Sequence, residues 1–228
     1  MDRVSGGRIA FALLGASALA AGICTAALRG MADAHYYNAR TILSTAAGER
    51  RLPEAAELTS AQASLAAALA LEPANPLFVE QRARTYEMRA LRLPRSDPAA
   101  GALMRDALRQ YREAALMRPG SPYAWTAIAE LKLGLDDLDF EFYGALDRAA
   151  QYGRWEPAVQ LALAEIGFSG WPLLAQPAKL LVLDAVARAL PRQGADIRQL
   201  AKQYGVLPLV CKEAAGRKPE FTDLCAAN

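Results

Sequence analysis

The feature that most constrains this chain is an apolar run without a charged residue, from Ile9 to Leu28. About twenty helical residues rise roughly 30 Å, which matches the hydrocarbon thickness of a bilayer. Arg3 and Arg8 precede the run, and this slight positive bias predicts a cytoplasmic N-terminus with the following chain outside the cytoplasm. We therefore expect a cytoplasmic n-region (1–8), a transmembrane helix (9–28) and a juxtamembrane helix or linker (29–53).

A cleaved signal peptide is the competing interpretation, because Ala18-Leu19-Ala20 has the A-x-A form that signal peptidase accepts. The apolar run continues past this point through Ile23, which favours an uncleaved anchor. Cys24 is expected to be an apolar side chain within the span, since Ile23 before it is too large for a lipid-attachment signal. Both interpretations export the body of the chain, and the anchor predicts a single-pass protein of a bacterial inner membrane with a periplasmic body.

An internal repeat follows the apolar run. Two stretches share a spacing of 4, 3 and 5 residues: Ala107, Tyr111, Ala114 and Pro119, and Ala61, Leu65, Ala68 and Pro73. Small residues let neighbouring helices approach closely and the larger ones fill the space between them. The dipeptides Asn75-Pro76 and Ser121-Pro122 each supply a cap and a pre-set first turn for the next helix. The pattern resembles the tetratricopeptide repeat, a helix–turn–helix unit of about 34 residues.

The repeat has departures. Lys132 stands where that family prefers tyrosine, and an insertion rich in proline and small residues occupies the region around Leu93–Ala102. A helical bundle without true repeats therefore stays an alternative. No stretch shows sustained strand alternation, so we predict an all-α fold with a single N-terminal transmembrane helix followed by tetratricopeptide-like stacked helical hairpins. The expected domains are a tetratricopeptide-like domain (54–205) and a C-terminal tail (206–228).

Apolar residues at helical spacing locate the later helices. One predicted face carries Trp155, Val159, Leu163 and Ile166. A further amphipathic helix, started by Pro177, carries Leu180, Leu183, Ala187 and Leu190. A separate short helix is expected between Gly194 and Gly205.

Cysteine and histidine usage limits the chemistry. In an oxidising periplasm, Cys211 and Cys225 most simply form a disulfide that clips the tail, and two unpaired thiols are the alternative. Such a loop of about fifteen residues would stabilise the fold by roughly 3 kcal/mol. The only histidine, His35, follows the apolar run and is interpreted as a polar residue at the membrane–water boundary. An imidazole pair or multi-histidine metal site is thereby excluded, and we expect neither a metal nor a cofactor.

The distribution of charged residues favours neither nucleic-acid binding nor catalysis. The formal net charge is +2 and both signs are interspersed, so no basic face for nucleic acid is predicted. An acidic cluster, Asp136, Asp137, Asp139 and Glu141, falls at a predicted turn and helix start, where carboxylates stabilise exposed backbone N–H groups. We therefore predict that the chain is not an enzyme, and keep a carbohydrate-active hydrolase built on this cluster as the least favoured alternative.

Stacked helical hairpins usually act as binding surfaces, because they curve into a groove lined by the first helix of each repeat. The predicted groove residues are Arg84, Glu87, Tyr123, Glu130, Leu161 and Glu165. This mixture of charge and apolar surface favours a protein segment over an anionic polymer. Solvent-exposed faces of ordinary helices are the competing interpretation at each position.

One family resemblance narrows the expected function. It is carried by Ala145-Leu146-Asp147-Arg148-Ala149-Ala150, by Gly153-Arg154-Trp155-Glu156-Pro157-Ala158-Val159-Gln160-Leu161-Ala162-Leu163, by Trp171 and by Arg188-Ala189-Leu190. The similarity covers roughly residues 105–190 and the N-terminal span. This part of the chain is similar to VpsP-like proteins, which are tetratricopeptide-like membrane proteins associated with bacterial exopolysaccharide synthesis. The resemblance implies a scaffold or accessory role, with envelope proteins of polysaccharide synthesis or export as partners. A scaffold of a secretion, pilus or division complex is the alternative.

Overall fold

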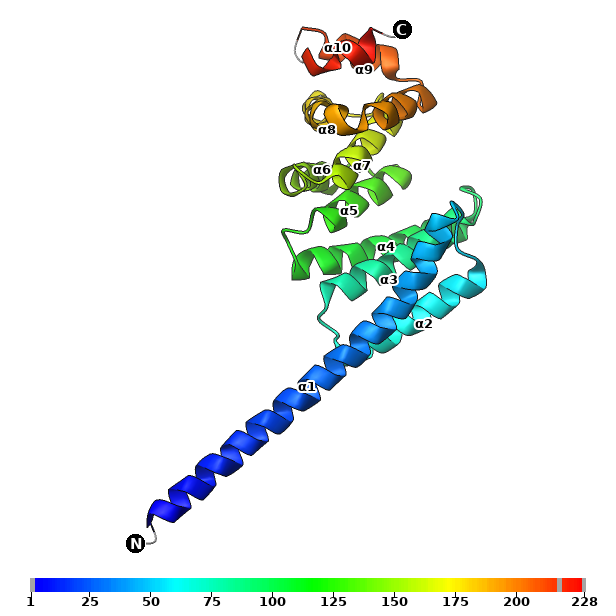
Figure 1. Cartoon of the computed structure of the whole chain (residues 1–228). Coiled ribbons are helices and arrows are strands. Elements are labelled where there is room, and N and C mark those ends of the chain that lie inside the picture. The colour runs from blue at the N-terminus through cyan, green and yellow to red at the C-terminus, as the bar shows by residue number, and fades with distance from the viewer. Residues whose placement is uncertain (1–2, 217–218, 227–228) are drawn as a thin grey trace. The chain divides into compact units, whose positions relative to one another are not determined.

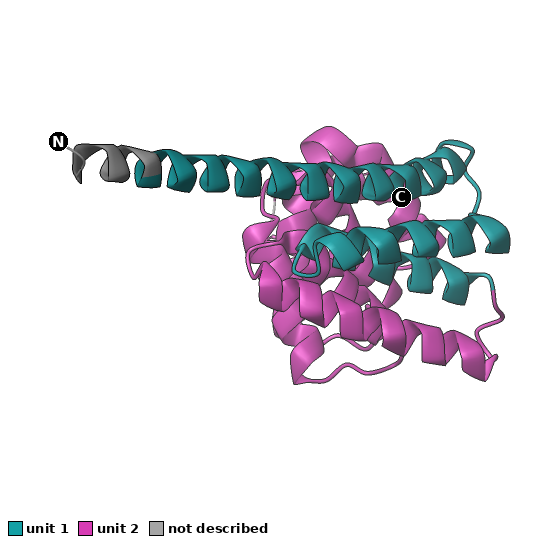
Figure 2. Ribbon diagram, turned by 90° about the horizontal axis from the view of Figure 1, so that it is seen from below, with its two compact units in different colours: residues 1–92 teal, residues 93–228 magenta. Residues whose placement is uncertain are grey.

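The computed structural model describes the backbone of residues 3–216 and 219–226, and within these ranges the side chains from residue 10 onward. Residues 1 and 2 of the predicted n-region, and residues 217, 218, 227 and 228 of the predicted tail, lie outside the described residues. Within the described ranges the fold is all-α and contains no strand, as predicted. The chain divides into two compact units, unit 1 (Met1–Arg92) and unit 2 (Leu93–Asn228), which are coloured separately in Figure 2.

Unit 1 contains three helices, α1 (Arg3–Gly48), α2 (Ala55–Leu71) and α3 (Pro76–Leu91). Unit 2 contains the remaining elements: α4 (Pro98–Met117), α5 (Pro122–Gly134), α6 (Phe140–Tyr152), α7 (Pro157–Ser169), α8 (Gln176–Gln203), α9 (Leu207–Ala214), the 3-10 helix η1 (Pro219–Phe221) and α10 (Thr222–Cys225). The boundary between the units falls at the start of the predicted insertion around Leu93–Ala102. Asp97 caps α4 there by accepting a hydrogen bond from the Ala99 N–H, and Pro98 occupies the first turn.

Helix α1 joins the apolar segment to the body without a break. Its apolar half carries exposed side chains, such as Phe11 at 82% and Ile23 at 63% exposure, and the helix is long and apolar enough to cross a membrane. The expected single N-terminal candidate transmembrane helix is thus confirmed, whereas its orientation stays a prediction. Figure 1 shows the second half of α1 running beside α2.

The second half of α1 is the first element of the core of unit 1. Ala39 and Leu43 are buried against Leu58, Ala61 and Leu65 of α2. Each helix contributes both alanine and leucine, so small side chains allow close approach and larger ones fill the space between the helices. Consequently α1 is both the candidate anchor and one arm of a helical hairpin, with the connection to α2 confined to residues 49–54.

Unit 2 is built of stacked helical hairpins. Consecutive helices pair, α4 with α5, α5 with α6 and α7 with α8. Helices two apart in the sequence also pack, α5 against α7 and α6 against α8. The α5–α6 hairpin therefore lies beside the α7–α8 hairpin (Figure 1). Small residues mediate the closest approach, because a Cβ on Gly167 of α7 would lie 2.3 Å from Cγ1 of Val182 on α8.

Two details of the predicted helices differ. Trp155 was expected on the buried face of a helix, but it precedes α7 and is 71% exposed, because Pro157 sets the helix start after it. The separate helix predicted between Gly194 and Gly205 is the second part of α8, which continues past Pro191 through a kink at Gln193. Leu180 is 39% exposed, since the buried face of α8 is centred on Val182 and its neighbours instead.

Candidate functional site

The six predicted groove residues lie on three helices in two units. Arg84 and Glu87 are on α3 of unit 1, whereas the others are on α5 and α7 of unit 2. Helices α5 and α7 pack against each other, and Glu130 of α5 and Glu165 of α7 both lie close enough to Tyr204 to affect its pKa. Arg84 lines a separate pocket within unit 1, and Glu87 lies one turn further along α3 and is half-buried.

We define the α5–α7 surface as Tyr123, Glu130, Glu156, Leu161, Glu165 and Tyr204. At one end the Tyr123 hydroxyl donates to Oε2 of Glu156 at 3.1 Å. At the other end the hydroxyl of Tyr204, the C-cap residue of α8, donates to Oε1 of Glu165 at 3.1 Å. Leu161 is half-buried on α7, about one turn from Glu165.

The α5–α7 surface carries three carboxylates, those of Glu130, Glu156 and Glu165. Burial raises the pKa of Tyr204, the nearby carboxylates of Glu165 and Glu130 raise it further, and the opposing charge of Arg95 lowers it. The structure therefore brings Glu130 and Glu165 together beside one tyrosine, although they come from different helices. Carboxylates and tyrosine hydroxyls accept hydrogen bonds from amines and guanidinium groups, so the surface suits a polypeptide that carries basic side chains.

The acidic cluster is part of an ion-pair network around Lys132. This lysine is 1% exposed, and its Nζ donates to Asp137 at 2.6 Å and to Asp139 at 3.0 Å and lies 3.1 Å from Glu141. Arg112 of α4 donates from Nε to Glu141 at 2.6 Å. Asp139 also caps α6, as its carboxylate accepts from the backbone N–H groups of Glu141 and Phe142.

The pKa shifts of this network follow from those contacts. Burial alone would lower the pKa of Lys132, but its hydrogen bonds to the three carboxylates raise it overall. The pKa of Asp139 is lowered first by the Phe142 N–H and then by Lys132, and that of Glu141 first by Arg112. The cluster lies at a turn and a helix start as predicted, and its charges neutralise the buried lysine that departs from the repeat pattern.

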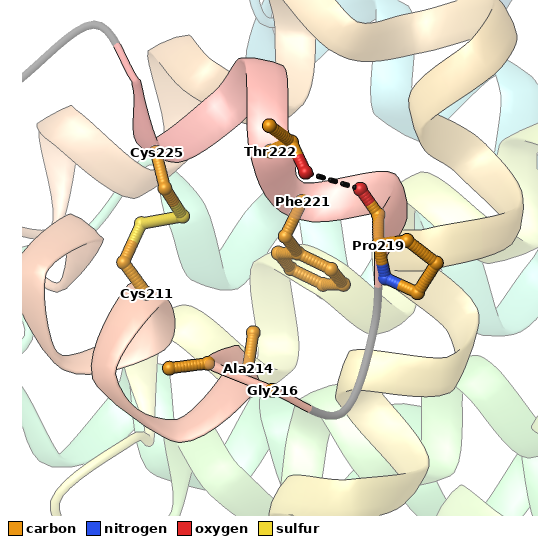
Figure 3. A pocket seen from close by; sticks show the side chains of 8 residues that line it. Cys211, Ala214, Gly216, Pro219, Phe221, Thr222 and Cys225 are labelled. Atoms are coloured by element: carbon orange, nitrogen blue, oxygen red, sulfur yellow. Dashed lines mark hydrogen bonds between the residues drawn. A yellow bond between two sulfur atoms is a disulfide. The ribbon is translucent and has the colours of Figure 1, made fainter.

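The C-terminal cysteines pair. Cys211 of α9 and Cys225 of α10 have their sulfur atoms 2.06 Å apart, as expected for the predicted disulfide. Figure 3 shows them beside an apolar cavity of about 360 Å³ that Ala214 and Phe221 also line. The Thr222 hydroxyl in this cavity donates to the carbonyl of Pro219 at 2.7 Å, so it is already used within the fold.

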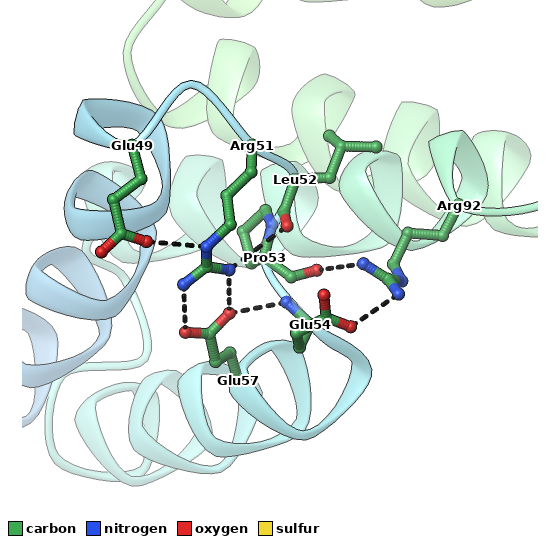
Figure 4. Close-up of polar contacts among 7 residues, drawn as sticks. All are labelled: Glu49, Arg51, Leu52, Pro53, Glu54, Glu57 and Arg92. Atoms are coloured by element: carbon green, nitrogen blue, oxygen red, sulfur yellow. Dashed lines mark hydrogen bonds and ion pairs between the residues drawn. The ribbon is translucent and has the colours of Figure 1, made fainter.

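A cluster of ion pairs and hydrogen bonds, which was not predicted from the sequence, fixes the turn between α1 and α2 (Figure 4). The Arg51 guanidinium donates to Glu49 at 2.7 Å and to both oxygens of Glu57 at 2.7 and 2.8 Å. Glu57 also accepts from the Glu54 N–H, and these bonds lower the pKa of Glu57 to about 2. Arg92 at the end of α3 donates to Glu54 at 2.7 Å. The Glu54-x-x-Glu57 spacing, a capping box, was the signal that could have revealed this cluster.

Two further residues singled out in the sequence lie on α1. His35 is half-buried on α1, and Cys24 is an exposed free cysteine in the apolar half of that helix. In the part of the chain that the structure describes, no three His, Cys, Asp or Glu side chains are grouped so as to hold a metal ion. Neither the protein-family models nor the curated protein sequences contain a match to this chain.

Proposed function

We propose that this chain is a membrane-anchored, periplasmic scaffold that binds a protein of exopolysaccharide synthesis or export. The observation that carries the proposal is the continuity of α1, whose exposed apolar half leads directly into a helical hairpin. A body held so closely to a bilayer is suited to bringing a partner to the membrane surface.

The α5–α7 surface supports a role in protein binding. It joins α5 and α7, which pack against each other, and it combines tyrosines and half-buried Leu161 with carboxylates. Tyrosine is enriched where protein interfaces bind most strongly, because its ring adds contact area and its hydroxyl adds a hydrogen bond. The tetratricopeptide assignment belongs to this proposal and is supported by the buried alanines at the repeat positions, such as Ala114, Ala129 and Ala164.

The proposed periplasmic location and the proposed link to exopolysaccharide have separate support. A Cys211–Cys225 disulfide is stable in an oxidising periplasm and would be reduced in a cytoplasm. The link to exopolysaccharide rests on the resemblance of residues 105–190 to VpsP-like proteins.

Affinity capture of the full-length chain from detergent-extracted membranes tests the proposal. We expect glycosyltransferases, polymerases or export components to be recovered, and we expect Glu165→Lys on the α5–α7 surface to reduce that recovery. Asp147→Lys makes the same charge change on an exposed position of α6 and serves as the matched control. Recovery of secretion, pilus or division proteins instead would assign the scaffold to another envelope machine, and equal recovery by both variants would remove the α5–α7 surface as the binding site.

A further inference from the structure

Unit 1 contains a polar pocket that the proposed function does not use. Its volume is about 440 Å³, within the range of small-ligand sites. Residues spaced three or four apart on α1 form one wall, and two residues of α3 form the other. The lining residues are Tyr36, Arg40, Leu43, Ser44, Ala47, Gln81 and Arg84.

Two cations face this pocket without a carboxylate in its lining. Several other arginines of unit 1 do form ion pairs: Arg29 with Glu72, Arg51 with Glu49 and Glu57, and Arg92 with Glu54. Among the described residues, neither Arg40 nor Arg84 forms an ion pair with a carboxylate. Burial raises the pKa of Tyr36, the charge of Arg40 opposes this, and Glu80 and Asp33 raise the pKa further, but neither carboxylate lines the pocket.

The walls of the pocket are held in place from behind. The Tyr36 ring stacks on Phe78 of α3 with ring centroids 5.2 Å apart, and Leu43 is buried in the α1–α2 core. The two helix backbones that carry Arg40 and Arg84 are therefore fixed by packing, while both arginine side chains are exposed. Binding of a ligand then has to order only the side chains, and less ordering on binding means that more of the interaction free energy appears as affinity.

We propose that this pocket binds a carboxylate-bearing saccharide unit. A planar guanidinium donates two parallel hydrogen bonds to a carboxylate, so Arg40 and Arg84 can bind and neutralise the acid group. The Tyr36 hydroxyl, the Ser44 hydroxyl and the Gln81 amide then supply donors and acceptors for sugar hydroxyls.

An acidic peptide and a lipid headgroup fit the pocket less well. The only apolar lining residues are the buried Leu43 and the small Ala47, so no hydrophobic cavity is available for a peptide anchor side chain. Arg40 follows Leu28 by 12 residues, or about 18 Å of helix, whereas the headgroup layer is roughly 5–8 Å deep. The pocket therefore lies beyond the headgroups of the membrane in which α1 would be anchored.

Isothermal titration calorimetry tests this proposal, with trigalacturonate titrated into the full-length chain in detergent micelles. We expect saturable binding that weakens with added salt, and at least about tenfold weaker binding in Arg40→Gln and in Arg84→Gln. Arg89→Gln is the control, because Arg89 lies on the same helix and its guanidinium bonds Gln62 outside the pocket. Helical circular dichroism verifies that each variant is folded.

Three ligand comparisons decide the chemistry. The methyl ester of trigalacturonate keeps every hydroxyl and loses the charge, and we expect it to bind at least about tenfold more weakly. The proposal would be overturned if the ester, inorganic phosphate or a tetraglutamate peptide bound as tightly as trigalacturonate. It would also be overturned if Arg89→Gln weakened binding as much as Arg40→Gln and Arg84→Gln. Partner capture by the α5–α7 surface should be unchanged in Arg40→Gln, so failure here is distinguishable from failure of the scaffold proposal.

Discussion

Replacing Lys132 by methionine tests whether the acidic cluster serves the fold. The substitution keeps the shape of a side chain that is 1% exposed and removes a cation bonded to Asp137 and Asp139 at 2.6 and 3.0 Å. Removing one partner of a buried ion pair costs about 3–5 kcal/mol. Here the two carboxylates are 51% and 49% exposed and water can solvate them, so we expect a smaller loss of about 1–2 kcal/mol.

Tryptophan fluorescence during urea denaturation of the full-length chain in micelles measures this loss in unit 2, because all three tryptophans belong to that unit. Lys202→Met removes an exposed lysine and should change the free energy of unfolding by less than about 0.5 kcal/mol. The double variant with Asp137→Asn should lose less than the sum of the single losses, since both changes remove the same bond. An unchanged or more stable Lys132→Met protein would refute the reasoning.

The pH dependence of stability gives the same network a second test. The pKa values of Asp139 and Glu141 are lowered from 3.8 and 4.5, so their contribution to stability is present above these values and is lost as the pH falls below them. Lys132 is not the largest cause of either shift, so Lys132→Met should retain most of this acid sensitivity. The difference in stability between the variant and the parent should therefore narrow, without vanishing, as carboxylates protonate below about pH 4.

Three further predictions follow from the packing. Gly167→Ala places a methyl group against Val182, and thermal denaturation should show a loss of about 1–3 kcal/mol. Serine at both Cys211 and Cys225 removes the clip and should lower the unfolding free energy of unit 2 by about 3 kcal/mol in urea titrations, where no change would contradict a formed disulfide. Deleting residues 1–30 keeps the packed half of α1, so the product should be soluble and helical by circular dichroism; aggregation would contradict this architecture.

Sequence periodicity predicted the helices well because the repeat positions are fixed by close packing. Ala107, Ala114 and Ala129 are all fully buried, as their spacing required. The position of Trp155 was wrong because the rule that proline occupies the first turn outweighs apolar spacing at a helix start. The kinked continuity of α8 could not be predicted, since Pro191 inside a pattern signals a break without saying whether the helix resumes.

The candidate sites were predictable only in part, because they depend on contacts between distant residues. The cysteine pair needed only two residues and an expected compartment. By contrast, the role of Lys132 depends on the turn that returns Asp137 and Asp139 to it. Arg40 carried no sequence signal at all, since its pocket exists only where α1 faces α3.

The continuity of α1 also bears on whether the N-terminal segment is an anchor or a cleaved signal. Cleavage after Ala20 would leave Ile23 and Leu28, which are 63% and 42% exposed, on a helix facing water. A retained segment instead places both side chains in lipid and starts the buried face at Ala32, one turn after the apolar run ends. With so few residues between lipid and core, the bilayer would set the orientation of unit 1. The intact mass of the membrane-extracted protein decides the question, because loss of the first twenty residues would remove about 2 kDa and with it the support for an anchor.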